Sequence, residues 1–321
     1  MSEKKDLRIV FMGTPEIAVA SLQAILQAGY TVVGVVTAPD KPAGRGRKIQ
    51  LSEVKKFALD QNLRVLQPTN LKSDEFLREL TDLRPDVQVV VAFRMLPRAV
   101  WALPPLGTFN MHASLLPQYR GAAPINWAVI NGETQTGVTT FFLDEEIDTG
   151  RIIDFRQTEI FPHDTAGTLH DRIKTLGAGL VVETLNQIAA ATVTTRAQEE
   201  LINQADLLKK APKIFRDDCR IDWTRPGREI QNLIRGLSPV PGAFTELGKQ
   251  EQPLLMKIYE AGVIEESHHL PPGRILSDNK NFIRVSTIDG YIEVKSMQAA
   301  GKKRMETPDF LRGFDISPYV E

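Results

Sequence analysis

Three polar residues in the middle of the chain have the types and the spacing that proton-transfer chemistry needs. Asn110 and His112 stand two residues apart at the end of an expected strand, residues 108–112, and Asp148 follows later in the chain. Side chains two apart on a strand project from the same face, and ligands bind at the carboxyl ends of strands in open α/β sheets. An amide, an imidazole and a carboxylate that converge there could stabilise an oxyanion and move protons. We therefore take Asn110, His112 and Asp148 as candidate catalytic residues.

Each of these residues also has a structural interpretation. A single histidine at a strand end is often only hydrogen bonded, Asn110 could cap a turn, and Asp148 could stabilise the Thr149-Gly150 turn that follows it. The acidic stretch 144–148 lacks the alternating oxygen ligands and the distant glutamate of a calcium loop. We predict no metal site.

The first half of the chain alternates β-rich apolar runs with helical patterns, which predicts a parallel-rich α/β sheet covered by helices. After the first strand, Thr14 is expected to cap a helix that has Pro15 in its first turn. The continuous apolar run 87–92 predicts a central strand that is buried on both faces. The expected strands cover residues 7–12, 31–37, 64–66, 87–92, 108–112, 138–143 and 152–157, and the expected helices after the first cover 51–61, 73–83 and 164–190.

The pattern changes in the second half. A polar stretch, residues 191–208, is predicted to link two domains, 1–190 and 209–321. Beyond it, a short helix over 226–237 precedes several short strands that are separated by Pro, Gly, Asp and Asn, a pattern typical of a small OB-like β-barrel. These strands are expected at 243–247, 254–259, 273–276, 282–286 and 291–297.

Composition places the chain among ordinary globular proteins. Its 39 Lys+Arg and 40 Asp+Glu nearly cancel, so any nucleic-acid surface must come from local clusters. The single cysteine, Cys219, excludes an internal disulfide framework and suits a reducing compartment. The apolar run at 7–12 is far shorter than the roughly 20 residues that span a bilayer. We expect a soluble, cytoplasmic protein that does not bind membranes.

Asn110-x-His112, followed by Ser114-Leu-Leu-Pro-Gln-Tyr-Arg-Gly121 and then by Asp148-Thr-Gly150, resembles the signature of folate-dependent formyltransferases. The resemblance implies a Rossmann-like catalytic domain, the three candidates acting together, and 10-formyltetrahydrofolate as the formyl donor. Where many relatives have Ala-Tyr-Gly, this chain has Ala92-Phe93-Arg94, which puts the fine folate contacts in doubt. The residues that the resemblance implies for folate binding are Phe93, Arg94, Met95, Leu96, Ser114, Leu115, Leu116, Pro117, Asp144 and Ile147.

Two further features resemble methionyl-tRNA formyltransferases. The basic segment 41–48 carries four positive charges and no negative one, and its Pro and Gly residues are expected to keep it out of helix and sheet. It resembles that family's tRNA-contacting loop, and several stretches after residue 210 resemble its OB-like terminal domain. The residues implied to bind tRNA are Lys41, Arg45, Arg47, Lys48, Lys209, Lys210, Lys302, Lys303 and Arg304.

The resemblance implies formyl transfer to the methionine of charged initiator tRNA, and we expect direct transfer by a monomeric enzyme. Cys219 lies in the other domain and Ser114 lacks a nucleophile-elbow context, so no covalent nucleophile is expected. A folate enzyme with a small-molecule acceptor is the nearest alternative. A nicotinamide dehydrogenase would need the three-glycine fingerprint, which the stretch after the first strand lacks. A non-catalytic RNA-binding protein would leave the Asn-His-Asp arrangement unexplained.

Arg45 is the residue of the basic segment that we expect to contact tRNA most directly. Arg45→Ala should raise the apparent KM for tRNA and lower the slope of its salt dependence by about one, because one phosphate contact is lost. Steady-state kinetics over a salt series measure both quantities. Unchanged kinetics across the series would rule the contact out.

Overall fold

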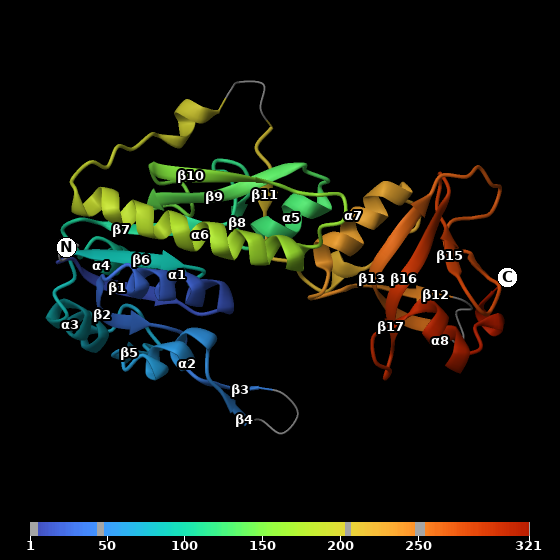
Figure 1. The fold of residues 1–321 in the computed structure, drawn as a ribbon, viewed down its shortest axis with the longest axis horizontal. Coiled ribbons are helices and arrows are strands. Elements are labelled where there is room, and N and C mark those ends of the chain that lie inside the picture. Colours follow the sequence, from blue (N-terminus) through green and yellow to red (C-terminus); the bar gives the residue numbers. More distant parts are fainter. Residues whose placement is uncertain (1–5, 44–47, 203–206, 248–253, 321) are drawn as a thin grey trace. The chain divides into compact units, whose positions relative to one another are not determined.

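The computed structural model describes residues 6–43, 48–202, 207–247 and 254–320. The described chain divides into two compact units (Figure 1). Unit 1 comprises residues 1–121, 135–159 and 170–210, and unit 2 comprises 122–134, 160–169 and 211–321. The units are therefore not continuous along the chain, unlike the predicted ranges 1–190 and 209–321.

Unit 1 contains a seven-stranded sheet with the strand order β10-β9-β7-β6-β1-β2-β5. The five strands from β7 to β5 pair in parallel, whereas β9 is antiparallel to both β7 and β10. This mixed, parallel-rich sheet confirms the predicted fold class. The strands are β1 (Arg8–Gly13), β2 (Thr31–Val36), β5 (Val65–Leu66), β6 (Val87–Val91), β7 (Thr108–His112), β9 (Gln135–Phe142) and β10 (Ile152–Glu159).

The burial of β6 agrees with its central place in the sheet. All five residues of β6 are buried, as the continuous apolar run predicted, and β6 lies between β1 and β7. Helix α6 packs closely against β7, because a Cβ on Gly177 would come within 2.8 Å of the Met111 side chain. Figure 1 shows this long helix running across the sheet. The helices with residues in unit 1 are α1 (Glu16–Gln27), α2 (Glu53–Asp60), α3 (Asp74–Asp82), α4 (Arg98–Trp101) and α6 (Ala166–Ala189).

A side chain caps two of the helices in unit 1, and a third helix lacks the cap that its sequence predicted. Ser52 and Ser73 accept backbone N–H bonds at the starts of α2 and α3. The predicted cap by Thr14 is wrong: Pro15 is the N-cap of α1, with extended backbone angles (φ −81°, ψ 175°), and no side chain caps this helix. The extended Pro15 keeps the helix from starting before Glu16.

The basic segment is more regular than its composition predicted. Residues Lys41–Ala43 (β3) and Lys48–Gln50 (β4) pair as two short antiparallel strands, so the expectation that Pro and Gly exclude sheet is wrong. Proline is tolerated in a short edge strand, where its missing N–H breaks no central ladder. Arg45 and Arg47 lie outside the described residues.

Unit 2 is built on an antiparallel sheet with the order β12-β13-β16-β15-β14, beside which β17 pairs with β16. This confirms the predicted antiparallel β domain. Its helix α7 (Gly227–Leu237) packs against the sheet through buried residues that include Ile230 and Ile234. The other elements are α5 (Pro124–Ile130), β12 (Ala243–Leu247), β13 (Leu254–Ile264), β14 (Ile275–Ser277), β15 (Ile283–Ser286), β16 (Tyr291–Ala299), β17 (Met305–Glu306) and α8 (Thr307–Gly313).

Two short strands that the sequence did not predict also pair: β8 (Arg120–Gly121) and β11 (Lys210–Ala211). The predicted linker contains a 3-10 helix, η1 (Gln198–Leu201), so part of it is ordered structure. Among the described residues, no helix is both long enough and apolar enough to cross a membrane.

Close packing of α5 against α7 makes Gly236 sensitive to substitution. A Cβ at this position would lie 2.4 Å from the Ile130 side chain and 2.9 Å from the Ile130 backbone nitrogen. Gly236→Ala should therefore lower the free energy of unfolding by about 1–3 kcal/mol, because backbone atoms must shift. Gly179→Ala in α6 is the matched control. Its Cβ meets nothing within 4 Å, so it should raise stability by up to about 1 kcal/mol through helix propensity. Chemical denaturation measures both changes, and equal effects would contradict the packing explanation.

Candidate functional site

The site begins at the carboxyl end of β7. His112 is the last residue of this strand and is 6 % exposed, and Asn110 is half-buried two positions earlier. Asn110 lies between Val90 of β6 and Phe141 of β9 in the sheet register. The strand therefore holds both polar side chains on one face of the sheet.

Hydrogen bonding determines which nitrogen of His112 can exchange a proton. Its Nε2 lies 2.9 Å from the backbone oxygen of Tyr119. A carbonyl oxygen only accepts, so Nε2 must carry a hydrogen and donate it. The exchangeable position is then Nδ1, which faces the Asp148 Oδ2 at 3.8 Å. This distance is too long for a direct hydrogen bond, but it suits the attraction between a carboxylate and a protonated ring.

Asp148 occupies an unusual backbone conformation. Its φ is +57°, in the left-handed region, which aspartate tolerates better than most residues. Its Oδ2 accepts a hydrogen bond of 2.9 Å from the backbone N–H of Gly121. The same oxygen thus faces His112 and anchors the loop that follows β7.

The residues around Asp148 restrict this turn. Asp144 accepts from the Glu146 backbone N–H and from the Thr149 hydroxyl, at 3.1 and 2.8 Å. A Cβ on Gly150 would lie only 1.7 Å from the Phe142 backbone oxygen, so only glycine fits there. Asp144 therefore has a visible structural role at the exposed start of the turn.

The loop after β7 is held by a buried threonine. The Thr139 hydroxyl donates to the Ser114 backbone oxygen at 2.7 Å and accepts from the Leu116 backbone N–H at 3.1 Å. Ser114 donates its own hydroxyl to the Gln118 backbone oxygen at 2.6 Å. Leu116 and Pro117 are buried and joined by a cis peptide bond. These contacts place Tyr119, whose carbonyl receives the His112 hydrogen.

Gln198, in the predicted linker, is a residue of this site that the sequence analysis missed. It is fully buried, and its amide nitrogen donates to the backbone oxygens of Asp148 and Gly150, both at 2.9 Å. Its amide oxygen accepts from the guanidinium of Arg120 at 3.0 and 2.7 Å. No signal in the polar stretch 191–208 distinguished this glutamine.

The residues expected to bind folate lie partly on the loop after β6. β6 and β7 are parallel neighbours, so this loop and Ser114–Pro117 leave the sheet at the same edge. Leu96 is buried in the core, whereas Met95 is 67 % exposed. Arg94 donates to the backbone oxygens of Pro68 and Thr69. Its side chain is thus tied to the loop after β5 rather than left free.

The remaining predicted folate residues differ in exposure. Phe93 packs against the core of unit 1, and Leu115 is half-buried. Ile147 is 61 % exposed beside Asp148. An exposed large apolar side chain next to a catalytic candidate is available to cover a flat apolar group of a ligand.

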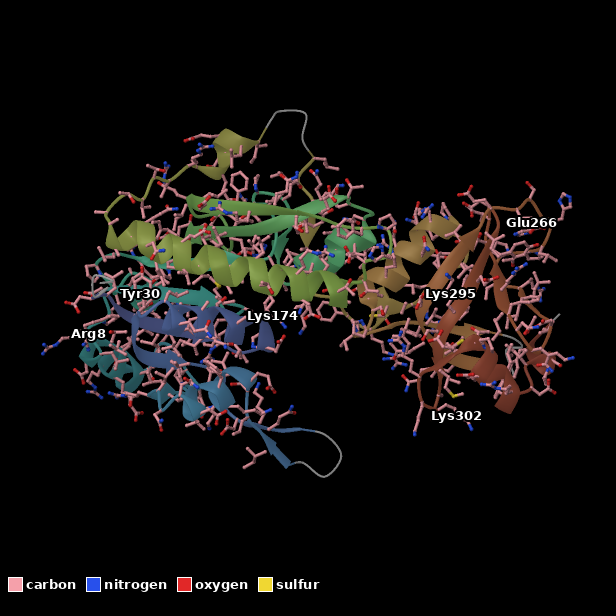
Figure 2. The ribbon with its side chains drawn as sticks, in the orientation of Figure 1. Arg8, Tyr30, Lys174, Glu266, Lys295 and Lys302 are labelled. Carbon is pink, nitrogen blue, oxygen red and sulfur yellow. The ribbon has the colours of Figure 1, made fainter. Side chains whose placement is uncertain are left out.

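The lysines and arginines expected to bind tRNA come from separate elements. Lys41 is exposed on β3, and the side chain of Lys48 on β4 is not described. Lys209 is placed by its backbone, which donates to the Gln118 side chain and accepts from the Tyr119 N–H. Lys210 is exposed on β11. Lys302, Lys303 and Arg304 are exposed in the turn between β16 and β17, where Figure 2 labels Lys302.

One cluster among the described residues has metal-ligand composition: Glu16, His170 and Asp171. The Lys174 ammonium donates to Glu16 at 2.6 Å and to Asp171 at 3.2 Å, and the hydrogen bond to Glu16 raises the pKa of Lys174. The two carboxylates therefore already share the charge of one lysine. The expectation that the protein uses no metal stays a prediction.

Comparison with known proteins identifies the family of this chain and agrees with its fold. The formyl transferase family model matches residues 7–185, and the model of the formyl transferase C-terminal domain matches residues 213–315. The class is therefore that of the formyltransferases, with both of the family's domains present.

Relatives at higher identity define a narrower family. The methionyl-tRNA formyltransferase of Bacteroides thetaiotaomicron is 53 % identical over 316 residues, covering 98 % of each chain. That of Parabacteroides distasonis is 54 % identical over 321 residues, covering 99 % of each. The chain belongs to the methionyl-tRNA formyltransferase family. The structure of HypX from Aquifex aeolicus in complex with tetrahydrofolic acid shares the fold (TM-score 0.63, 17 % identity, covering 98 % of this chain and 48 % of that one).

Thr139 gives a direct test of how the loop after β7 is held. Thr139→Val keeps the shape but leaves the buried Leu116 N–H without its acceptor, so the free energy of unfolding should fall by about 1–3 kcal/mol. Thr175→Val, at an exposed position of α6, should change it by less than about 0.5 kcal/mol. Denaturant titrations compare the two variants. An unchanged midpoint for Thr139→Val would show that the loop does not depend on this hydroxyl.

Proposed function

We propose that this chain transfers the formyl group of 10-formyltetrahydrofolate to the free α-amino group of methionine on charged initiator tRNA. The observation that carries the proposal is that Asp148 faces His112, on the strand that also carries Asn110, in a chain that resembles methionyl-tRNA formyltransferases over nearly its whole length. The products are formylmethionyl-tRNA and tetrahydrofolate.

The reaction requires one bond to form and one to break. The neutral amine attacks the formyl carbon, and the carbonyl oxygen becomes an oxyanion in a tetrahedral intermediate. The bond between that carbon and the folate nitrogen then breaks, the amine loses a proton and the folate nitrogen gains one. The side chains must therefore stabilise a negative oxygen and carry one proton between two nitrogens. These steps need no metal ion.

We assign the stabilisation of the oxyanion to the amide of Asn110 and to a protonated His112. The Nε2 hydrogen of His112 is bonded to Tyr119, so the ring exchanges its proton at Nδ1, on the side of Asp148. The Asp148 carboxylate faces the ring at 3.8 Å and orients it. Proton transfer between the amine and the folate nitrogen would pass through this pair or through a water between them.

We place folate at the sheet edge where the loops after β6 and β7 leave the strands. The flat donor would lie against the backbone of Phe93–Leu96 and of Ser114–Pro117, with Asp144 and Ile147 on the side of the Asp148 turn. The Arg94 guanidinium is held by the backbone oxygens of Pro68 and Thr69. We therefore assign Arg94 to the support of this loop rather than to direct contact with the ligand.

The tRNA is bound through its phosphates. We propose that the basic segment binds phosphates near the acceptor end of the tRNA, through Lys41, Arg45, Arg47 and Lys48. Lys209 and Lys210 would bind phosphates at the edge of the site. Lys302, Lys303 and Arg304 in unit 2 add attraction that does not depend on sequence. We further propose that the enzyme acts as a cytoplasmic monomer.

A transfer assay tests the function directly. The purified chain is given 10-formyltetrahydrofolate with methionine-charged initiator tRNA, and methionine-charged elongator tRNA serves as the control. Formylation restricted to the initiator is the expected result. Release or transfer of formyl groups without any need for tRNA would keep the folate chemistry but overturn the proposed acceptor.

His112 should be essential for turnover but not for folding. His112→Ala removes the ring that exchanges the proton, so kcat should fall by about 10²–10⁴-fold. His170→Ala, a half-buried histidine on α6, is the matched control and should keep the kcat of the unaltered chain. Circular dichroism checks that both variants fold. Near-normal turnover by folded His112→Ala would remove His112 from the mechanism.

A further inference from the structure

We propose that Gln198 is a positioning residue of formyl transfer: its side-chain amide fixes the turn at Asp148 and so holds the Asp148 carboxylate against His112. The inference rests on the function proposed above and extends it to a residue outside the Asn-His-Asp arrangement. The hydrogen bonds of Gln198 reach the backbone of Asp148 but not the side chains of Asn110, His112 and Asp148. It acts through the backbone of Asp148.

The segment that carries Gln198 is fixed before it reaches the site. Arg196 and Ile152 exchange two backbone hydrogen bonds of 2.9 Å, which attach this segment to the start of β10. Gln198 follows two residues later as the first residue of η1 and is 0 % exposed. A buried amide on an anchored backbone is a rigid support.

The four hydrogen bonds of Gln198 allow only one orientation of its amide. Both nitrogen hydrogens are used, on the backbone oxygens of Asp148 and Gly150, and the oxygen accepts from two Arg120 nitrogens. A flipped amide would set its oxygen against two carbonyl oxygens and its hydrogens against guanidinium donors. Gln198 is therefore a fully satisfied link between the Asp148 turn and Arg120.

The hydrogen bonds from Gln198 hold both ends of the turn from Asp148 to Gly150. The backbone of Asp148 is left-handed. This conformation costs on the order of 1 kcal/mol or more of folding free energy, and it persists only where the surrounding structure holds it. Gln198 holds the carbonyls of Asp148 and Gly150, while the backbone N–H of Gly121, next to Arg120, holds the carboxylate. With the backbone free to rotate, the carboxylate would lose its place 3.8 Å from His112.

Gln198→Glu separates positioning from simple packing. The glutamate keeps the size of the side chain and still accepts from Arg120, but a carboxylate cannot donate to the two carbonyl oxygens. We expect a fall in kcat of about 10–100-fold, the scale that misplacement of a reacting group produces. The KM values for folate and tRNA should stay within about two-fold of those of the unaltered chain. Gln198→Ala should give a similar fall if it folds.

Gln187→Ala is the matched control. Gln187 is a half-buried glutamine on α6 whose amide donates to Asp154 at 3.3 Å, away from the Asp148 turn. It should keep full turnover. A double-mutant cycle with Asp148→Asn adds a second criterion, because a residue that acts through the Asp148 carboxylate has little further effect once that charge is gone.

Three kinetic outcomes overturn the proposal: full kcat in folded Gln198→Glu, a loss confined to KM, or a loss of equal size in the Asp148→Asn background. A readout without substrates keeps it separate from the proposed function. The NMR resonances of the His112 ring should move in Gln198→Glu and stay in place in Gln187→Ala. If the unaltered chain fails to formylate tRNA, the proposed function fails while this spectrum still tests the positioning. Unmoved His112 resonances would overturn it.

Discussion

The left-handed turn at Asp148 is the constraint on which the site depends. One carboxylate oxygen accepts from the Gly121 backbone N–H and faces His112, which requires the turn to be held in place. Hydrogen bonds to a charged acceptor contribute about 1.5–3 kcal/mol each, enough to offset the backbone strain. Gly150 allows the turn to touch the backbone of β9, where any side chain would collide with Phe142.

Sheet topology explains why so many contacts are needed there. β9 runs antiparallel to β7, so it ends beside Thr108, at the opposite end of β7 from His112. The connection from β9 to β10 must therefore turn back along the sheet to bring Asp148 to the histidine. The loop after β7 is fixed independently through Thr139. The proposed chemistry thus lies where two separately held loops meet above one strand.

Much of this arrangement follows from the sequence because its patterns are strong. The valine-rich run at β6 and the spacing of Asn110 and His112 predicted the central sheet and the shared face. Other features depend on tertiary partners that no local pattern encodes. Gln198 occupies a polar stretch without periodicity, and its importance comes from partners 50 and 78 residues away. Similarly, β3 is a strand because it pairs with β4, although the local sequence, which contains Pro42, does not favour a strand.

The most direct measurement of the account is the single-turnover rate of formyl transfer by Asp148→Asn. Asparagine tolerates the left-handed conformation and can still accept from the Gly121 N–H, so the turn and the stability should be kept while the charge is removed. The account predicts a rate lower by on the order of 10²-fold with normal binding of both substrates. A rate equal to that of the unaltered chain would contradict it, because His112 would then work without the carboxylate that the whole turn is built to hold.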